Sequence, residues 1–368
     1  MGERLAPVGD VAVVLGTRPE IIKLAPVVRA LGARARLIWT GQHYDHSMAG
    51  NYFAGVGLAV PGDRLDGVGG EERGEQIVAV MAGLLTKFDL ERPRAVIVQG
   101  DTNTTNASAQ AAHYRGIPVV HVEAGLRSWD RAMPEEINRL VVGAVADLHC
   151  CATEGNATHL RRAGVAETSI VVTGNTIVEA TLAALPDRAS QDRLLATYQL
   201  PDAEFVLATI HRPENTDDPD RLSAIVEALA DLPWPVQIFL HPRTHQRIAR
   251  YGLAELAAAL RLAGPVDHQT FLGLAARARI LVSDSGGVQE EVTVVKKPLV
   301  VVRNSTERPE AIEAGFARMA QPGTIGSAVE AMATPEVAAE LLGVPCPFGD
   351  GQASQRIAAA TLALLARA

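Results

Sequence analysis

Short apolar runs alternate with longer stretches of helical periodicity along the chain. The run Val11–Leu15 is short, apolar and rich in β-branched residues, as expected for a strand buried on both faces. Behind it, Pro19 suits the first turn of a helix, apolar residues recur at helical spacing up to Leu31, and Gly32 can end the helix. Repeated strand–helix units of this kind predict an α/β fold with parallel sheets.

The alternation forms two similar series, and the 368 residues are enough for two domains. We therefore expect two Rossmann-like, doubly wound domains at residues 1–173 and 174–352, with a helix at 353–368 packing back on the first. Ligands of such folds bind beyond the carboxyl ends of the strands, which predicts a site in a cleft between the domains. The expected strands are 11–15, 37–40, 95–99, 119–123 and 171–173 in the first domain, and 205–209, 237–240, 280–283 and 299–303 in the second.

Composition and charge argue against several classes of protein. The net charge of −8 comes with no basic stripe, so a nucleic-acid binder is not expected. No apolar run is long enough for a membrane span, and the N-terminus lacks a signal-peptide pattern. Cys150, Cys151 and Cys346 have no CxxC spacing, which predicts small core residues and a reduced, cytoplasmic setting.

The glycine-rich segment 62–74 predicts a loop, either a flap over the cleft or a plain surface loop.

Carboxylates stand at strand ends or helix starts in three segments between residues 100 and 139. Asp101 follows the strand 95–99, Glu123 ends the strand 119–123, and Glu135 opens a predicted helix behind Pro134. Such positions converge on the ligand crevice of an α/β fold. Carboxylates gathered beside an anionic ligand indicate proton transfer and not charge complementarity.

Two strand-to-helix turns have the features of phosphate sites. Arg18 lies in the turn after the first strand, where free N–H groups and the helix dipole favour an anion. Ser285, Gly286 and Gly287 follow the strand 280–283 and precede a helix expected from Val288 onward. Glu291, about one turn further on, could accept hydrogen bonds from both ribose hydroxyls. The alternative is an ordinary helix start, with Asp284 or Ser285 as the N-cap and solvated glutamates.

Three histidines follow three predicted strands: His43 beside Gln42, His211 beside Arg212, and His241. His211 and Arg212 could bind phosphate oxygens, and the alternative for each histidine is a helix cap or a buried donor. No HExxH motif occurs and the histidines are scattered, so no metal is expected. Neither a GxGxxG motif after a strand nor a GxxxxGK[ST] loop is present, so neither NAD binding nor ATP hydrolysis is indicated.

Taken together, these motifs resemble the non-hydrolysing UDP-N-acetylglucosamine 2-epimerase family. The resemblance implies a GT-B-like fold, a UDP-sugar substrate, no cofactor and a homodimer. It also implies interconversion of UDP-GlcNAc and UDP-ManNAc through anti elimination of UDP and its re-addition. The matching strings, in family order, are 16–20 with Lys23, 41–43, 100–102, 121–127, 134–136 with Asn138 and Arg139, 173–176, 211–212, 284–291, 306–310 and 349–351.

The resemblance also implies roles for individual residues. Asp101, Glu123 and Glu135 become the acid/base candidates, and which of them removes the proton stays open. His211, Arg18 and the turn 285–287 would hold the diphosphate, with His211 also counted as catalytic, and Glu291 would hold the ribose. The remaining implied substrate contacts are Lys23, Gln42, His43, Arg139, Arg212, His241 and Arg308.

The chain departs from the family pattern at Pro213, which replaces an arginine of many bacterial members, and in a short segment between Arg127 and Pro134. These departures leave open whether a second UDP-GlcNAc activates the protein, as it does in some members.

Four other functions stay open: a hydrolysing epimerase that releases UDP and ManNAc, an epimerase of another UDP-sugar such as a diacetamido uronic acid, a GT-B glycosyltransferase, and a non-catalytic UDP-sugar sensor.

Overall fold

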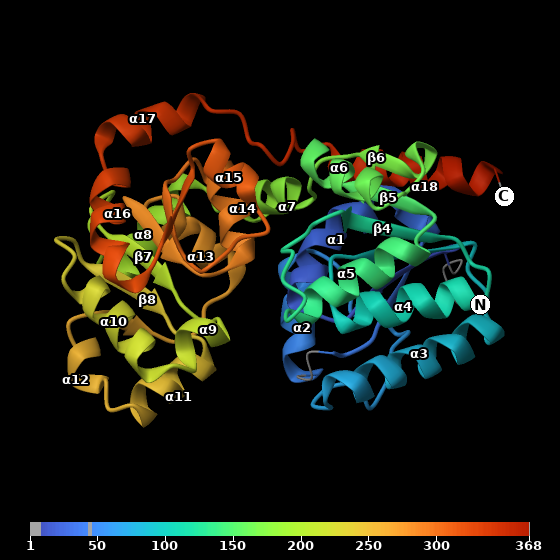
Figure 1. Ribbon diagram of the computed structural model, residues 1–368, viewed down its shortest axis with the longest axis horizontal. Coiled ribbons are helices and arrows are strands. Elements are labelled where there is room, and N and C mark those ends of the chain that lie inside the picture. The colour runs from blue at the N-terminus through green and yellow to red at the C-terminus, as the bar shows by residue number, and fades with distance from the viewer. Residues whose placement is uncertain (1–8, 43–45, 368) are drawn as a thin grey trace, which may run out of the picture. The chain divides into compact units, whose positions relative to one another are not determined.

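The computed structural model describes residues 9–42 and 46–367, except for the side chains of 46–49 and 51. The chain divides into two compact units (Figure 1). The first unit runs to Ala180 and resumes at Phe348, and the second unit is Thr181–Pro347. Among the described residues, no helix is both long and apolar enough to cross a membrane.

The first unit is built on a six-stranded parallel sheet with the order β2-β1-β3-β4-β5-β6. The chain moves from β1 outward to β2 and then returns to the other side of β1, so the sheet has a switch point between β1 and β3. Its strands are β1 (Val11–Leu15), β2 (Ala35–Trp39), β3 (Ala95–Gln99), β4 (Val119–Ala124), β5 (Leu148–Cys151) and β6 (Ile170–Val172). Its helices are α1 (Arg18–Leu31), η1 (Gly32–Arg34), α2 (His46–Gly55), α3 (Arg73–Leu90), α4 (Asn103–Tyr114), α5 (Pro134–Val145), α6 (Glu154–Arg162), η2 (Glu167–Ser169) and α18 (Ala353–Arg367), and α7 (Ile177–Ala184) contains the unit boundary.

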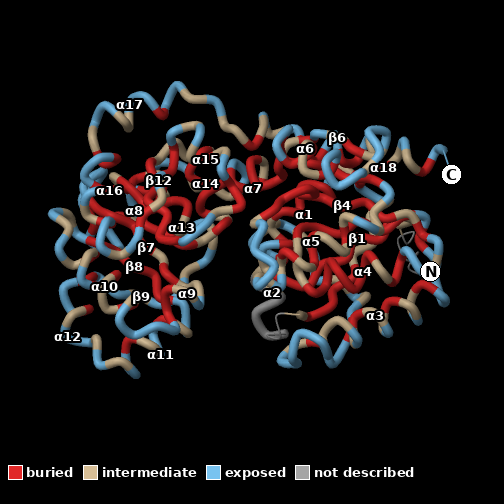
Figure 2. Tube along the Cα trace, viewed as in Figure 1, coloured by how far each residue is buried: buried red, intermediate tan, exposed pale blue. Residues whose placement is uncertain are grey.

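Both faces of the first sheet are covered by helices, which explains why its central strands are apolar throughout. Every residue of β1 and β4 is buried (Figure 2). Alternate side chains of β1 point to opposite faces. Val13 packs in one core cluster with Leu24 of α1 and Ile357 of α18, whereas Val14 packs in another with Leu84 of α3.

The second unit repeats this plan with the sheet order β12-β11-β10-β7-β8-β9, again all parallel. Its switch point lies between β7 and β10. The strands are β7 (Val206–Thr209), β8 (Val236–Phe239), β9 (Arg261–Ala263), β10 (Ile280–Ser283), β11 (Leu299–Val302) and β12 (Ala317–Ala320). The helices are α8 (Arg188–Tyr198), α9 (Pro213–Thr216), α10 (Pro219–Ala230), α11 (Pro242–Arg250), α12 (Ala254–Ala257), α13 (His268–Ala275), α14 (Gly286–Val295), α15 (Pro309–Glu313), η3 (Pro322–Thr324), α16 (Ile325–Met332) and α17 (Pro335–Gly343).

Each strand expected from the sequence overlaps an observed strand, but β5, β9 and β12 were not expected. β9 and β12 are edge strands with a charged residue in a short run, and β5 carries His149, so none of them shows a long apolar pattern. α14 begins at Gly286, two residues before the start expected at Val288. Cys150 and Cys151 are buried and unpaired, and Cys346 is partly buried.

The glycine-rich loop 62–74 is attached to the edge of the first sheet. The Trp39 N–H donates to the carbonyl of Asp63 at 3.0 Å, and the Leu65 N–H donates to the carbonyl of Trp39 at 2.8 Å. Leu65 and Val68 are buried in the core between the sheet, α3 and α4. This part of the loop is therefore held against the sheet by backbone hydrogen bonds and apolar packing.

Candidate active site

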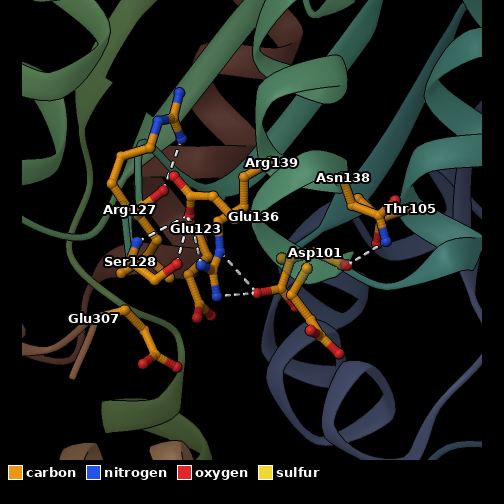
Figure 3. Close-up of polar contacts among 12 residues, drawn as sticks. Asp101, Thr105, Glu123, Arg127, Ser128, Glu136, Asn138, Arg139 and Glu307 are labelled. Carbon is orange, nitrogen blue, oxygen red and sulfur yellow. Dashed lines mark hydrogen bonds and ion pairs between the residues drawn. The ribbon is translucent and has the colours of Figure 1, made fainter. Parts of the chain in front are cut away.

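Asp101 lies at the switch point of the first sheet, directly after β3 and Gly100. Nε and Nη2 of Arg139 both donate to its Oδ2, at 2.9 and 2.6 Å, and Asn138 donates to its backbone carbonyl at 2.9 Å (Figure 3). The Asp101 side chain keeps 27% of its surface exposed, whereas that of Arg139 keeps 4%. Asp101 thus makes a charge-assisted contact with a buried cation and keeps part of its side chain exposed to a ligand.

Arg139 joins Asp101 to a second carboxylate. Its Nη1 donates to Glu136 at 2.9 Å, and Glu136 also accepts from the N–H and hydroxyl of Ser128 at 2.9 and 3.1 Å. Burial works against ionisation of Glu136, but these hydrogen bonds and the Arg139 charge outweigh it and lower its pKa. The guanidinium of Arg139, expected to bind substrate, thus lies between two carboxylates of its own unit.

Glu123 adopts a left-handed backbone conformation with φ of 61°, which is rare for a residue other than glycine. It is part of an irregularity in the pairing of β4 with β5, between Val122 and Ala124. Its buried Oε2 accepts from Lys23 Nζ at 2.6 Å and from Gln99 Nε2 at 2.7 Å. Strained backbone and bulges of this kind re-aim side chains at functional sites.

The other candidates of the first unit make contacts of their own. Glu135 is on the first turn of α5, with 38% of its side chain exposed and Arg73 3.9 Å away. Gln42 accepts from the N–H and hydroxyl of Thr104 at 2.8 and 2.9 Å. The Arg18 guanidinium lies over the ring of Tyr52, 5.4 Å from its centroid. His43 falls outside the described residues.

Glu20 was not singled out from the sequence, yet it occupies the turn expected to bind an anion. Its Oε2 accepts from the Gly16 N–H at 3.0 Å, and the hydroxyls of Thr102 and Thr105 lie 2.9 and 3.1 Å from Oε1. Burial raises its pKa from 4.5 to about 7, since these hydrogen bonds offset only part of the cost of desolvation. The Gly16 N–H is thus used internally.

The turn around Gly16 also leaves no space for a side chain. A Cβ atom there would lie 2.1 Å from Oγ1 of Thr104 and 2.3 Å from Oγ1 of Thr40.

A buried histidine supports the turn that carries Asp101. Nε2 of His121 lies 2.8 Å from the carbonyl of Gly100, and burial lowers the pKa of His121 to about 3. A neutral imidazole donating this hydrogen bond holds the turn that carries Asp101.

Asp284 organises the switch point of the second sheet. It is fully buried and accepts from the N–H groups of His211 and Arg212, the latter at 2.8 Å, and from Asn215 Nδ2 at 2.9 Å. His211 Nδ1 lies 3.1 Å from its Oδ1. Burial alone would raise the Asp284 pKa, but His211 and the other donors lower it overall. Asp284 therefore links the turn after β7 to the turn after β10.

The start of α14 lies in the turn after β10. Ser285 is its N-cap residue and makes no side-chain capping hydrogen bond, and Gly286 and Gly287 form the first helical positions. A Cβ atom on Gly286 would lie 2.7 Å from Nη1 of Arg308. Backbone N–H groups at a helix start, with a guanidinium against them, favour an anion.

Arg308 belongs to a buried charge network that the sequence did not reveal. It donates to Glu290 and to Glu307, each at 2.7 Å, and Arg303 donates to the other oxygen of Glu307 at 2.8 Å. Arg212 lies 3.8 Å from Glu307. The members come from the turn after β7, from α14 and from the loop after β11, so the sequence alone did not show that they meet.

Two further candidates of the second unit, Glu291 and His241, each lie next to a histidine. Oε1 of Glu291 lies 2.8 Å from Nε2 of His268. The rings of His241 and His211 lie 6.1 Å apart, and burial, with help from His211 and Arg243, lowers the His241 pKa. Within the described ranges, no group of three or more His, Cys, Asp or Glu side chains could hold a metal ion.

Comparison with known proteins places this arrangement in a family. A family model described as UDP-N-acetylglucosamine 2-epimerase matches residues 28–362. The chain belongs to the UDP-N-acetylglucosamine 2-epimerase family. It is 38% identical over 323 residues to a UDP-N-acetylglucosamine 2-epimerase of Methanocaldococcus jannaschii, covering 83% of this chain and 86% of that protein.

Other members of the 2-epimerase family show how far the likeness extends. The crystal structure of the Methanocaldococcus jannaschii UDP-GlcNAc 2-epimerase in complex with UDP-GlcNAc and UDP matches with a TM-score of 0.85 at 36% identity, over 97% of this chain and 99% of that one. A UDP-2,3-diacetamido-2,3-dideoxy-D-glucuronate 2-epimerase of Pseudomonas aeruginosa is 35% identical over 362 residues, or 94% of this chain and 97% of that protein. The expected family and the GT-B-like α/β fold are thereby confirmed.

Proposed function

We propose that this member of the 2-epimerase family interconverts UDP-GlcNAc and UDP-ManNAc without hydrolysis. The observation that carries the proposal is the pair of carboxylates, Asp101 and Glu123, at the ends of β3 and β4, each paired with a buried cation. The match to the family model and the name of the Methanocaldococcus jannaschii relative support the substrate.

The chemistry of the substrate explains why carboxylates are needed. The C2 proton of the sugar is not adjacent to a carbonyl, so removing it alone is very unfavourable. Anti elimination breaks the C1–O bond to UDP as a base takes the C2 proton, and it leaves a 2-acetamidoglucal. Re-addition of UDP at C1, with a proton delivered to the opposite face of C2, gives the epimer. The protein must supply a base, an acid and an anion site for UDP.

Asp101, Glu123 and Glu135 supply the acid/base groups in this proposal. Arg139 places a buried cation against Asp101, and Lys23 places one against Glu123. Glu135 makes a longer ion pair, with Arg73 at 3.9 Å, and keeps 38% of its side chain exposed.

The second unit supplies most of the UDP site in this proposal. The start of α14 at Ser285, Gly286 and Gly287 binds the diphosphate, with His211 beside it and Arg308 behind it. Glu291 accepts from the ribose hydroxyls. Arg18, Gln42, His43, Arg212 and His241 complete the proposed substrate contacts.

Proton NMR of the protein with UDP-GlcNAc in D₂O tests the proposal. UDP-ManNAc with deuterium at C2 is the expected product, since the C2 proton exchanges with solvent during elimination. Free ManNAc with UDP would instead assign the protein to the hydrolysing type. An unchanged spectrum would overturn the proposed substrate.

A second candidate substrate is a UDP-2,3-diacetamido uronic acid. The name of the Pseudomonas aeruginosa relative, at 35% identity, favours it. The same NMR measurement with that nucleotide sugar distinguishes the two substrates by the ratio of their kcat/KM values. The homodimer implied by the resemblance stays a prediction, which light scattering of the purified protein would test.

A further inference from the structure

A histidine of the second unit fixes one oxygen of Glu291. His268 opens α13, and its Nε2 lies 2.8 Å from Oε1 of Glu291 on α14. Both side chains are largely buried, with 15% and 11% of their surfaces exposed. An ionised carboxylate oxygen only accepts hydrogen bonds, so Nε2 of His268 carries the hydrogen and donates it. The pair therefore holds Glu291 in one orientation.

The position of Glu291 on α14 relates it to the helix start. Glu291 follows Gly287 by four residues, so both lie on the same face of the helix, roughly one turn apart. Gly287 belongs to the first turn, which has no side-chain cap at Ser285. A diphosphate at this helix start would thus have a carboxylate one turn further along the same face.

We propose that His268 is a positioning residue for ribose recognition, holding Glu291 so that Oε2 accepts from the vicinal hydroxyls of the nucleotide. This inference rests on the nucleotide site of the proposed function. A carboxylate already fixed at Oε1 loses little side-chain freedom when it binds the ribose, and preorganisation of this kind strengthens binding. His268 then contributes to the preference for a ribonucleotide over a 2′-deoxyribonucleotide without contacting the ligand.

Calorimetric titration of UDP and 2′-deoxy-UDP into the full chain tests this role. The unaltered protein should bind UDP more tightly than 2′-deoxy-UDP. His268→Phe keeps a ring but removes the donor, and it should weaken UDP binding by roughly 10-fold and 2′-deoxy-UDP binding much less. His268→Gln keeps a donor and should retain most of the preference. The matched control is His245→Phe, because His245 is exposed on α11 of the same unit.

Glu291→Gln provides a second measurement that does not depend on the stability of the histidine variants. It should reduce the same preference, and adding His268→Phe to it should cause no further loss. Equal weakening of both nucleotides by His268→Phe, or an unchanged preference in Glu291→Gln, would overturn the inference while leaving the nucleotide site intact. A wild-type protein that does not bind UDP would overturn the nucleotide site itself, and this inference with it.

Discussion

The two units share one strand plan but place different chemistry at their switch points. In the first unit, the residues after β3 and at the end of β4 are carboxylates paired with buried cations, Asp101 with Arg139 and Glu123 with Lys23. In the second unit, the carboxylate after β10 is Asp284, which accepts backbone N–H groups and His211, and an uncapped helix start follows it. The same topology therefore presents carboxylates paired with buried cations in one unit and an uncapped helix start in the other, which the proposed function uses for proton transfer and for anion binding.

The largest expected effect comes from the carboxylates of the first unit. Asp101→Asn, Glu123→Gln and Glu135→Gln should each lower turnover by roughly 10²–10⁴-fold, because each removes a proton donor or acceptor while keeping the size of the side chain. UDP affinity should stay nearly unchanged, since the proposed anion site belongs mainly to the second unit. Turnover from NMR and affinity from calorimetry check the two expectations.

Glu75→Gln is the matched control for these variants, because Glu75 is exposed on α3 of the same unit. Near wild-type turnover in all three carboxylate variants would contradict the proposal that the first unit supplies the proton-transfer groups.

The positions of Asp101 and Glu123 at strand ends could be predicted from the sequence, but their partners could not. Asp101 follows one apolar strand and Glu123 lies near the end of the next, so their place at the carboxyl ends of the strands could be predicted from local pattern. Arg139 was expected to bind substrate, and nothing in its spacing shows that it lies between Asp101 and Glu136. In the second unit, Asp284 and His211 are 73 residues apart in sequence, and only the sheet order makes them neighbours.

Two edge strands, β9 and β12, were not predicted because their sequences lack the apolar pattern of the central strands. The central strands of each sheet are apolar because helices cover both faces, so their runs stand out. The edge strands β9 and β12 carry Arg261 and Arg318, which breaks the apolar pattern by which a strand is found. The burial of Glu20 could not be predicted either, because a glutamate in the first turn of a helix normally lies in solvent.

The next prediction concerns the buried ion pair between Lys23 and Glu123. Lys23→Met removes the cation and leaves Glu123 buried with Gln99 as a neutral donor. Removal of one partner from a buried pair costs about 3–5 kcal/mol, so the free energy of unfolding should fall by about that amount. Urea unfolding measures it. The control is the double variant Lys23→Met with Glu123→Gln, which removes both charges and should recover part of the loss; a double variant no more stable than the single one would contradict the pairing.

Two buried carboxylates sharpen the comparison between the units through their opposite pKa shifts. Burial raises the pKa of Glu20 to about 7, since one backbone N–H and the surrounding hydroxyl groups offset only part of the cost of desolvation. Asp284 has a lowered pKa, since backbone N–H groups, Asn215 and His211 all favour its charge. Ionised Glu20 is therefore poorly compensated, whereas ionised Asp284 is well compensated.

The sign of the Glu20 effect on stability follows from its raised pKa. Between pH 4.5 and about 7 the unfolded chain releases this proton while the folded protein keeps it, so stability falls as pH rises through this range. The free energy of unfolding should fall by about 3 kcal/mol over this range because of Glu20. Glu20→Gln resembles the protonated form and should remove this part of the pH dependence. Urea unfolding at pH 5 and pH 8 checks it, and parallel curves for the variant and the wild type would contradict the raised pKa.

The smallest expected effect tests whether the anion site belongs to the second unit. His211→Ala should weaken UDP binding by roughly 10-fold, because it removes a donor next to the uncapped start of α14. Arg18→Ala should do the same from the first unit, where its guanidinium lies over Tyr52. Calorimetry with UDP measures both, and His245→Ala on exposed surface is the control. If Arg18→Ala weakens UDP binding and His211→Ala does not, the diphosphate is held mainly by the first unit, and the proposed contrast between the two switch points fails.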